Sequence, residues 1–279
     1  MNAADFDHFC QMVRARSGLV LTPEKTYLVN SRLGPVARGL GLAGVPELLT
    51  LLRTAPTEGL TQQCVDAMAT HESFFFRDST PFDQLVQTVL PKLVEARRTS
   101  RTLRIWCAAC SSGQEPYSVA MVLQEFGAQL SGWRLEIVAT DMSAPILQKA
   151  RSGLYSDFEA RRGLSDERLQ RWFKREGPSW RVQPALQQMV SFRSQNLLQG
   201  AAGMGQFDVI FCRNVLIYFD VAQKTKILAD LARSLADDGY LLLGSAETVI
   251  GVTDAFELTP GGRGLYRPAT VKAPVARIA

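Results

Sequence analysis

From about Leu103 onward the sequence alternates short apolar runs with amphipathic segments of helical periodicity, and no other feature limits the possible folds so strongly. The first segments are LRIWCAA, EPYSVAMVLQEF, RLEIVAT and SAPILQKA. After an interruption the alternation continues with FDVIFC, a helix from about Ala222 to Leu235, and YLLLG. Strand and helix in alternation are typical of βαβ units with parallel strands and right-handed crossovers. We therefore predict an α/β domain with a doubly wound, Rossmann-like sheet.

The length of 279 residues exceeds the usual size of one domain, so a smaller partner domain is expected. Residues 6–68 have the periodicity of short amphipathic helices, one ending near Ser17-Gly18 and another running from Pro23 to about Leu40. A polar stretch interrupts the strand and helix pattern and predicts a small inserted subdomain. The predicted divisions are an N-terminal helical domain at 1–70, a linker and connecting helix at 71–98, the α/β domain at 99–270 with its insertion at about 155–193, and a flexible tail at 271–279.

The composition, with 46% hydrophobic and 21% charged residues, is that of a soluble globular protein with a proper core. The longest apolar stretches fall far short of the roughly 20 residues that a membrane span needs, so no transmembrane helix is predicted. The first ten residues lack the basic and then apolar regions of a secretory signal. We therefore expect a cytoplasmic location.

Five cysteines are an odd count, which does not suit a disulfide framework and predicts reduced thiols. Cys107 and Cys110 form a lone C-x-x-C, but the chain has no second pair and only two histidines, so neither a metal site nor redox chemistry is predicted. The net charge of +4 is mild, and the arginines are scattered along the chain. This charge pattern disfavours a nucleic acid partner.

In an open parallel sheet, ligands bind beyond the carboxyl ends of the strands, so the strand-to-helix turns hold the candidate site residues. The first turn, Ala108–Pro116, consists mostly of small residues and leads into a helix. It lacks the spacings of the two common phosphate-binding loops, and Glu115 would repel a pyrophosphate but pair with an α-ammonium group. The alternative is that Glu115 is only a first-turn acid favoured by the helix dipole.

Asp141 follows the second predicted strand, where nucleotide-binding folds place an acid that hydrogen-bonds ribose hydroxyls. It could also be the N-cap of the next helix. If Glu115 and Asp141 lie on adjacent strand ends, they suit a cofactor with an amino-acid end, a ribose and no phosphate, which is S-adenosylmethionine (SAM). The fourth strand end, 211–219, lacks the Asn/Asp-Pro-Pro-aromatic motif of many amino-group methyltransferases. An amino-group target is therefore disfavoured.

Over almost its whole length the sequence resembles the CheR family of chemotaxis receptor methyltransferases. The segments that carry the resemblance are 69–78, 106–118, 140–141 with 149–153, 207–220 and 244–247, and the run FDVIFCRNVLIYFD at 207–220 is especially specific. The resemblance implies a SAM-dependent methyltransferase fold with a helical N-terminal domain that meets the receptor and a small inserted β-subdomain. It also implies the product S-adenosylhomocysteine (SAH).

The resemblance further implies roles by position. Glu115 is expected to contact the methionine amino group and Asp141 the ribose. The remaining cofactor-binding residues implied are Asn196 and Leu197 at the adenine, Asn214 and Val215 along the pocket, and His71, Ser73 and Arg77 closing it from the linker. The family usually has Asn and Thr at the positions of His71 and Ser73. As catalytic residues, Arg77 and Tyr218 are expected to orient the substrate carboxylate, with Arg213 as a further candidate and simple packing as the alternative for Tyr218.

The reaction implied is methylation of receptor glutamates to glutamyl methyl esters. A glutamate is already ionised at neutral pH, with a pKa of about 4.3, so no general base and no catalytic His or Cys is predicted. The expected partner is the cytoplasmic helical domain of a chemotaxis receptor. The loop from Lys174 to Trp180 looks short beside relatives that dock on a receptor's C-terminal pentapeptide, so no such tether is expected. A monomer is the simplest expectation, and a non-catalytic SAM- or receptor-binding regulatory module is the alternative function.

Overall fold

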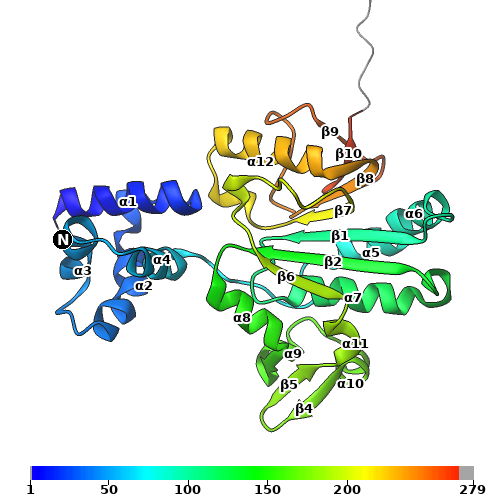
Figure 1. Ribbon diagram of the computed structural model, residues 1–279, viewed down its shortest axis with the longest axis horizontal. Helices are drawn as coiled ribbons and strands as arrows, with labels where there is room; N and C mark the ends of the chain where they lie inside the picture. Colours follow the sequence, from blue (N-terminus) through cyan, green and yellow to red (C-terminus); the bar gives the residue numbers. More distant parts are fainter. Residues whose placement is uncertain (1, 270–279) are drawn as a thin grey trace, which may run out of the picture. The chain divides into compact units, whose positions relative to one another are not determined.

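The computed structural model describes residues 2–269, so the predicted flexible tail lies outside the described residues. The chain divides into two compact units, coloured along the sequence in Figure 1. The first unit runs to Glu72 and also includes Tyr218–Gln223. Among the described residues, the second unit comprises Ser73–Ile217 and 224–269.

The first unit is helical. Its elements are α1 (Ala3–Ser17), the 3-10 turn η1 (Pro23–Lys25), α2 (Thr26–Gly39), α3 (Val45–Thr54) and α4 (Glu58–Met68). The N-cap of helix α1 is Asn2, whose side chain accepts a hydrogen bond from the Ala4 N–H, and its C-cap is Gly18, which has a left-handed φ of 77°. Phe9 and Val13 of α1 are fully buried, as their spacing indicates.

The second unit is built on a seven-stranded sheet with the order β6-β2-β1-β7-β8-β10-β9. Its strands are β1 (Thr102–Ala108), β2 (Arg134–Asp141), β6 (Val190–Ser194), β7 (Phe207–Cys212), β8 (Leu235–Leu243), β9 (Phe256–Leu258) and β10 (Leu265–Pro268). The first five of these pair in parallel, which confirms the predicted doubly wound α/β sheet. Strands β9 and β10 add an antiparallel edge that the sequence pattern did not indicate. The strand order reverses beside β1, so its carboxyl end is the expected ligand position.

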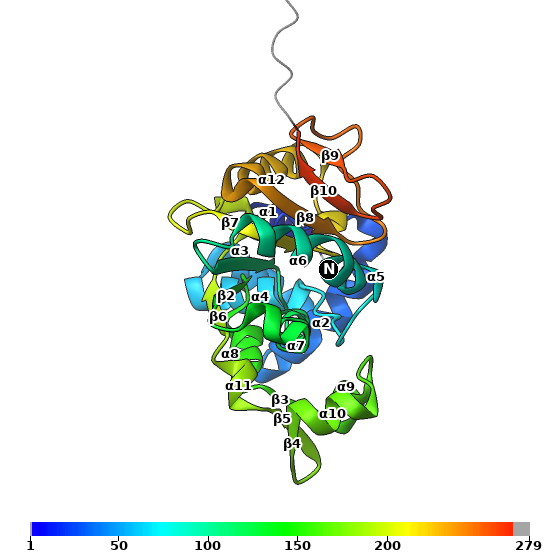
Figure 2. The ribbon, with the colours of Figure 1, turned by 90° about the vertical axis from the view of Figure 1, so that its right-hand side faces the viewer.

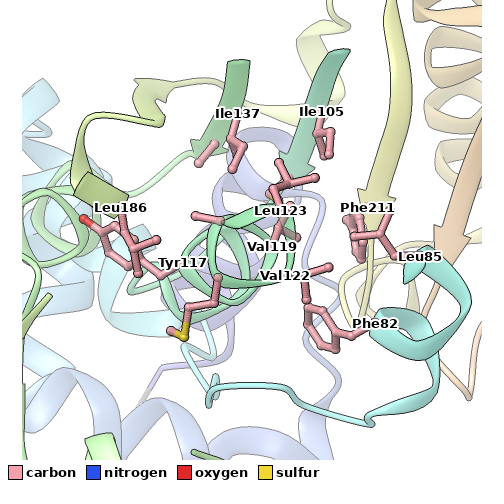
Figure 3. Packing of buried hydrophobic residues seen from close by; sticks show 14 of the residues in the cluster. Phe82, Leu85, Ile105, Tyr117, Val119, Val122, Leu123, Ile137, Leu186 and Phe211 are labelled. Carbon is pink, nitrogen blue, oxygen red and sulfur yellow. The ribbon is translucent and has the colours of Figure 1, made fainter. Parts of the chain in front are cut away.

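Helices pack on this sheet through alternate strand residues. The helical elements are α5 (Thr80–Gln84), the π-helical turn η2 (Leu85–Val89), α6 (Leu90–Ala96), α7 (Gln114–Phe126), η3 (Gly127–Leu130), α8 (Ala144–Ser152), η4 (Leu197–Gln199), η5 (Leu216–Tyr218) and α12 (Val221–Ser234). Figure 3 shows α7 packed against strand residues Ile105, Ile137 and Phe211, with Phe82 of α5 beside it. All four side chains are buried, so α7 and the three strands beside it share one core.

An inserted lobe follows α8 and contains a three-stranded antiparallel sheet of order β3-β5-β4, seen apart from the main sheet in Figure 2. It consists of β3 (Leu154–Ser156), α9 (Asp157–Arg161), α10 (Asp166–Trp172), β4 (Phe173–Glu176), β5 (Ser179–Val182) and α11 (Pro184–Gln187). Tyr155 joins the lobe to the main sheet, because its buried hydroxyl donates to the Ser112 carbonyl at 2.7 Å. Phe75 packs edge-on against both Tyr155 and Phe173.

Candidate active site

The loop after β1 is held in an uncommon backbone conformation. Ala109 and Ser111, both with side chains, have φ values of 56° and 51°, and Gly113 has 92°. A left-handed residue other than glycine costs about 1–2 kcal/mol, and such strain persists only where the surroundings fix it. Here the Ser111 N–H donates to Asp141 Oδ2 at 2.9 Å. At Gly113 a Cβ would lie 3.0 Å from the Ala150 Cβ, so the loop also packs closely on α8.

Ser111 carries a polar atom that the protein leaves unsatisfied. Its Oγ is buried and has no hydrogen-bond partner within residues 2–269. Buried hydroxyls are nearly always hydrogen-bonded, so an unpaired one at the carboxyl end of β1 fits a ligand that provides a partner. The loop is thus suited to a polar small molecule at the position where the strand order reverses.

Asp141 ends β2 and is 7% exposed. Its Oδ2 accepts from Ser111 and its Oδ1 from the Ser143 N–H at 3.0 Å, so the carboxylate joins the two strand ends. The N-cap of α8 is Ser143, which removes the alternative that Asp141 is only a helix cap. A carboxylate offers about four acceptor positions, and two of them remain for a ligand such as a pair of ribose hydroxyls.

Asn196 and Leu197 lie beside Asp141 because β6 pairs in parallel with β2. Ser194 is the register partner of Asp141, and the Gln195 N–H donates to the Asp141 carbonyl at 3.0 Å. The Asn196 side chain accepts from Leu198 as the N-cap of η4, and Leu197 is 8% exposed. The structure therefore brings together three of the predicted cofactor-binding residues at one end of β2 and β6.

Glu115 lies in the first turn of α7, and its Oε2 accepts from Arg213 Nη1 at 3.0 Å. Burial raises the pKa of Glu115, and the nearby Glu247 carboxylate acts in the same direction, while the guanidinium of Arg213 opposes the rise. The acid is therefore both a first-turn residue of the helix and a member of a charge network. It remains able to meet a second cation, since the contact with Arg213 does not fill a carboxylate.

Arg213 is an internal link between two parts of the site. Its side chain is only 2% exposed, and its Nη2 donates to the Arg77 carbonyl at 2.6 Å and to Asp78 Oδ2 at 3.2 Å. Its guanidinium carbon also lies 5.7 Å from the centre of the Phe82 ring. Through these contacts Arg213 holds Glu115 and the turn at Arg77 together, while its buried Nε has no hydrogen-bond partner in the described chain. A role for Arg213 in orienting a substrate carboxylate stays a prediction.

The turn that carries Arg77 is strained and held at both ends. Phe76 and Asp78 have φ values of 50° and 53°, the left-handed region that side chains rarely adopt. The Phe76 N–H donates to the Ser118 hydroxyl at 3.0 Å, and the Arg213 side chain donates to the Arg77 carbonyl. Strained turns that several surrounding contacts hold in one conformation are common at functional positions.

The other linker residues and Tyr218 have simpler surroundings. His71 and Ser73 lie half-buried in the extended chain between α4 and the turn at Arg77. Tyr218 is half-buried at the end of η5 and belongs to the first compact unit together with Phe219–Gln223. Ser73 and Arg77 belong to the second unit.

Glu247 is a functional candidate that was not predicted from the sequence. Asn214, with a φ of 57°, and Val215 follow β7, and their backbone N–H groups both donate to the buried carboxylate of Glu247. Segment 244–247 carries part of the family resemblance, but no role was predicted for Glu247. The available signal was an acid three residues after a glycine at the end of an apolar strand.

The cysteines show no sign of chemistry. All five thiols are free, and burial raises the pKa of both Cys107 and Cys110, which keeps them protonated and unreactive. Among residues 2–269 no group of three His, Cys, Asp or Glu side chains is placed to hold a metal ion. No helix in the same range is long and apolar enough to cross a membrane.

Two family models match the chain. One, described as the CheR methyltransferase SAM binding domain, matches residues 71–265, and the other, the CheR methyltransferase all-alpha domain, matches residues 4–69. The chain belongs to the CheR methyltransferase family. This confirms the predicted family and fold class, and it confirms SAM as the cofactor.

Curated members of the CheR family match almost the whole chain. The chemotaxis protein methyltransferase Cher2 of Pseudomonas putida is 42% identical over 269 residues, covering 95% of this chain and 98% of that protein. The chemotaxis protein methyltransferase 1 of Pseudomonas aeruginosa is 44% identical over 271 residues, covering 95% and 97%. The protein of the same name from Vibrio cholerae is 40% identical over 264 residues, covering 94% and 95%.

Proposed function

We propose that this CheR family member transfers the methyl group of SAM to glutamate side chains of chemotaxis receptors, forming glutamyl methyl esters for sensory adaptation. The observation that carries the proposal is the match at 40–44% identity, from end to end, to proteins named chemotaxis protein methyltransferases. A match confined to the SAM-binding domain would support only methyl transfer. Here the helical unit matches its own family model as well, which supports the same kind of protein substrate.

In this proposal the cofactor lies across the carboxyl ends of β1, β2, β6 and β7. Glu115 receives the methionine ammonium and Asp141 the ribose hydroxyls, since both carboxylates keep acceptor positions that the protein does not fill. The adenine then meets Asn196 and Leu197, which follow β6. Asn214 and Val215 extend the same site from β7, and His71, Ser73 and Arg77 close it from the linker. Ser111 Oγ supplies a further hydrogen-bonding atom.

The chemistry requires little from the protein beyond orientation. Bound SAM supplies a methyl group on a positively charged sulfur, and a receptor glutamate is already an anionic nucleophile. The chain must therefore hold the carboxylate in line and exclude water, and no proton has to be removed. Arg77 is proposed to pair with that carboxylate, and the proposal is supported by the contacts of Ser118 and Arg213 that fix its turn. Tyr218 is proposed as the second orienting group.

The proposed partner is the cytoplasmic helical domain of a receptor, met by the N-terminal helical domain at 1–70, with 71–98 as the linker and 99–270 as the catalytic domain. We propose that no pentapeptide tether is used, since β4 and β5 are joined by the two-residue turn Gly177-Pro178. A monomer in the cytoplasm is proposed as the working form. The alternative of a non-catalytic regulatory module gains no support from the comparisons.

The proposal is tested by incubating the full chain with SAM labelled in its methyl group and receptor cytoplasmic fragments from the same organism. Label that base releases as methanol is expected on the fragment, because methyl esters hydrolyse in base and methylated amides do not. An Asp141→Ala chain should transfer none, while Asp166→Ala, changed at a side chain that is 89% exposed, should match the wild type. Base-stable label, or SAM binding without label on any receptor, would contradict the proposal.

A further inference from the structure

Glu247 is 8% exposed, and its carboxylate accepts four backbone hydrogen bonds. Its Oε2 accepts from the N–H groups of Asn214 at 2.8 Å and Gly244 at 2.7 Å. Its Oε1 accepts from Val215 at 2.9 Å and Leu216 at 2.7 Å. The donors come from the loop after β7 and the loop after β8, so one side chain joins two neighbouring strand ends.

These four bonds fill the acceptor positions that a carboxylate offers. Glu247 therefore has no capacity left for a ligand, in contrast to Glu115. Three of the donors are consecutive and start the 3-10 turn η5, so the carboxylate acts on them as an anion does at a helix N-terminus. Asn214 needs such support, because its φ of 57° is unfavourable for a residue with a side chain.

Gly244 shows how closely the two loops fit. A Cβ at this position would lie 2.7 Å from Glu247 Oε2, 2.9 Å from Asn214 Nδ2 and 3.0 Å from the Asn214 backbone nitrogen. Backbone nitrogen and a fully engaged carboxylate cannot move aside cheaply, so the geometry requires glycine at 244. The arrangement of the loop after β7 thus depends on both residues.

We propose that Glu247 is a positioning residue for the methyltransferase site. By gathering four N–H groups it fixes the backbone of Asn214 and Val215 in the conformation that binds SAM, and it sets the start of the η5 turn that ends at Tyr218. The inference rests on the proposed function, which places Asn214 and Val215 against the cofactor. It assigns Glu247 no contact with cofactor or substrate.

The test is calorimetric titration of the full chain with SAH, comparing the wild type with Glu247→Gln. In the variant one oxygen becomes an NH₂ group, so in either orientation two backbone N–H groups face a donor. The Kd for SAH should rise about 10-fold or more, since buried unpaired groups are costly. Hydrogen exchange at the four donor amides should become faster. Gly244→Ala should reproduce both effects without changing charge, and the control Glu257→Gln, which alters an ion pair with Arg267, should change neither.

The outcomes separate this inference from the function on which it rests. If the wild-type chain does not bind SAH, the proposed function fails and the inference fails with it. If the wild type binds and Glu247→Gln binds equally well while its four amides exchange faster, only the inference is overturned. If Glu247→Gln does not fold, the SAH affinity of Gly244→Ala decides between the two outcomes. The wild type gives a second test, because bound SAH must slow hydrogen exchange at the amides of residues 214–216. Unchanged exchange at these amides overturns the inference.

Discussion

Two neighbouring regions at the same edge of the sheet use buried carboxylates in opposite ways. At the ends of β1 and β2, Asp141 accepts two backbone N–H groups and Glu115 meets one arginine, so both keep acceptor positions unfilled. At the ends of β7 and β8, Glu247 accepts four N–H groups and keeps none. Unfilled capacity marks a carboxylate that can bind a ligand, and saturation marks one that shapes the backbone.

The difference also explains why the first region holds an unpaired atom. Ser111 Oγ is buried without a partner in the described chain, next to Asp141. A protein tolerates such a group where a ligand completes it. The carboxylate of Glu247 needs no ligand, because four backbone N–H groups fill its acceptor positions.

The largest effect is expected from Asp141→Ala. The change removes the proposed ribose acceptor and leaves the N–H groups of Ser111 and Ser143 without theirs, so the Kd for SAH should rise about 100-fold or more in calorimetric titration. Asp166→Ala is the matched control. An Asp141→Ala chain that binds SAH normally would remove the ligand role from the first region.

A somewhat smaller effect, mainly on turnover, is expected from Arg77→Ala. Loss of the group that orients the substrate carboxylate should lower kcat for receptor methylation about 100-fold and change the Kd for SAH only a few-fold. Arg162→Ala is the control, since its guanidinium also lies over the Phe74 ring, at 4.4 Å, against 5.6 Å for Arg77. Equal losses in the two variants would point to packing of Phe74 as the cause.

Glu115 should make cofactor binding dependent on pH. Burial raises its pKa, so the carboxyl takes up a proton at higher pH than an ordinary glutamate, and the neutral acid cannot pair with the methionine ammonium. The charged groups that act on it are Arg213, Arg77 and Glu247. Affinity for SAH should fall on acidification, and the fall should begin at a higher pH than an ordinary glutamate would produce.

The Glu115→Gln variant isolates this titration. It should bind SAH about 10-fold more weakly at neutral pH and show a flatter dependence on acidification than the wild type, measured by titration in a series of buffers. Identical pH profiles in the two chains would show that another group governs the effect. Glu247→Gln is unsuited as a control here, because the Glu247 carboxylate itself helps to raise the pKa of Glu115.

The smallest effect concerns stability. Tyr155→Phe removes the buried hydrogen bond to the Ser112 carbonyl, which should cost about 1 kcal/mol and lower the thermal midpoint by about 2–4 °C. Tyr27→Phe, at a residue that is 73% exposed, should leave the midpoint unchanged. An equally stable Tyr155→Phe chain would mean that the inserted lobe does not help to hold the loop after β1.

The sequence pattern predicted those features that depend only on the order of residues along the chain. Alternating apolar runs predicted the parallel strands, which the structure confirms. Glu115 and Asp141 were predicted as ligands because they lie near the carboxyl ends of two adjacent strands, where ligands bind in such sheets. The antiparallel β9–β10 edge was not predicted, since short strands at the end of a chain carry little periodicity.

Contacts between distant segments could not be predicted in the same way. Arg213 reaches Asp78, 135 positions earlier, and Glu247 takes three of its four donors from a loop more than 30 positions before it. Neither side chain differs in type from an ordinary surface residue, so the sequence gives no sign that it is buried and fully engaged. Only the assembled sheet brings these partners together.

The central claim is that the unfilled carboxylates bind SAM while the saturated one shapes the site. It is tested most directly by a crystal structure of the full chain with SAH. The account predicts Glu115 within hydrogen-bond distance of the SAH amino group, Asp141 at the ribose, and Glu247 still bonded to its four N–H groups. A structure with SAH bound elsewhere, or with Glu247 contacting it in place of Glu115 and Asp141, would contradict the account.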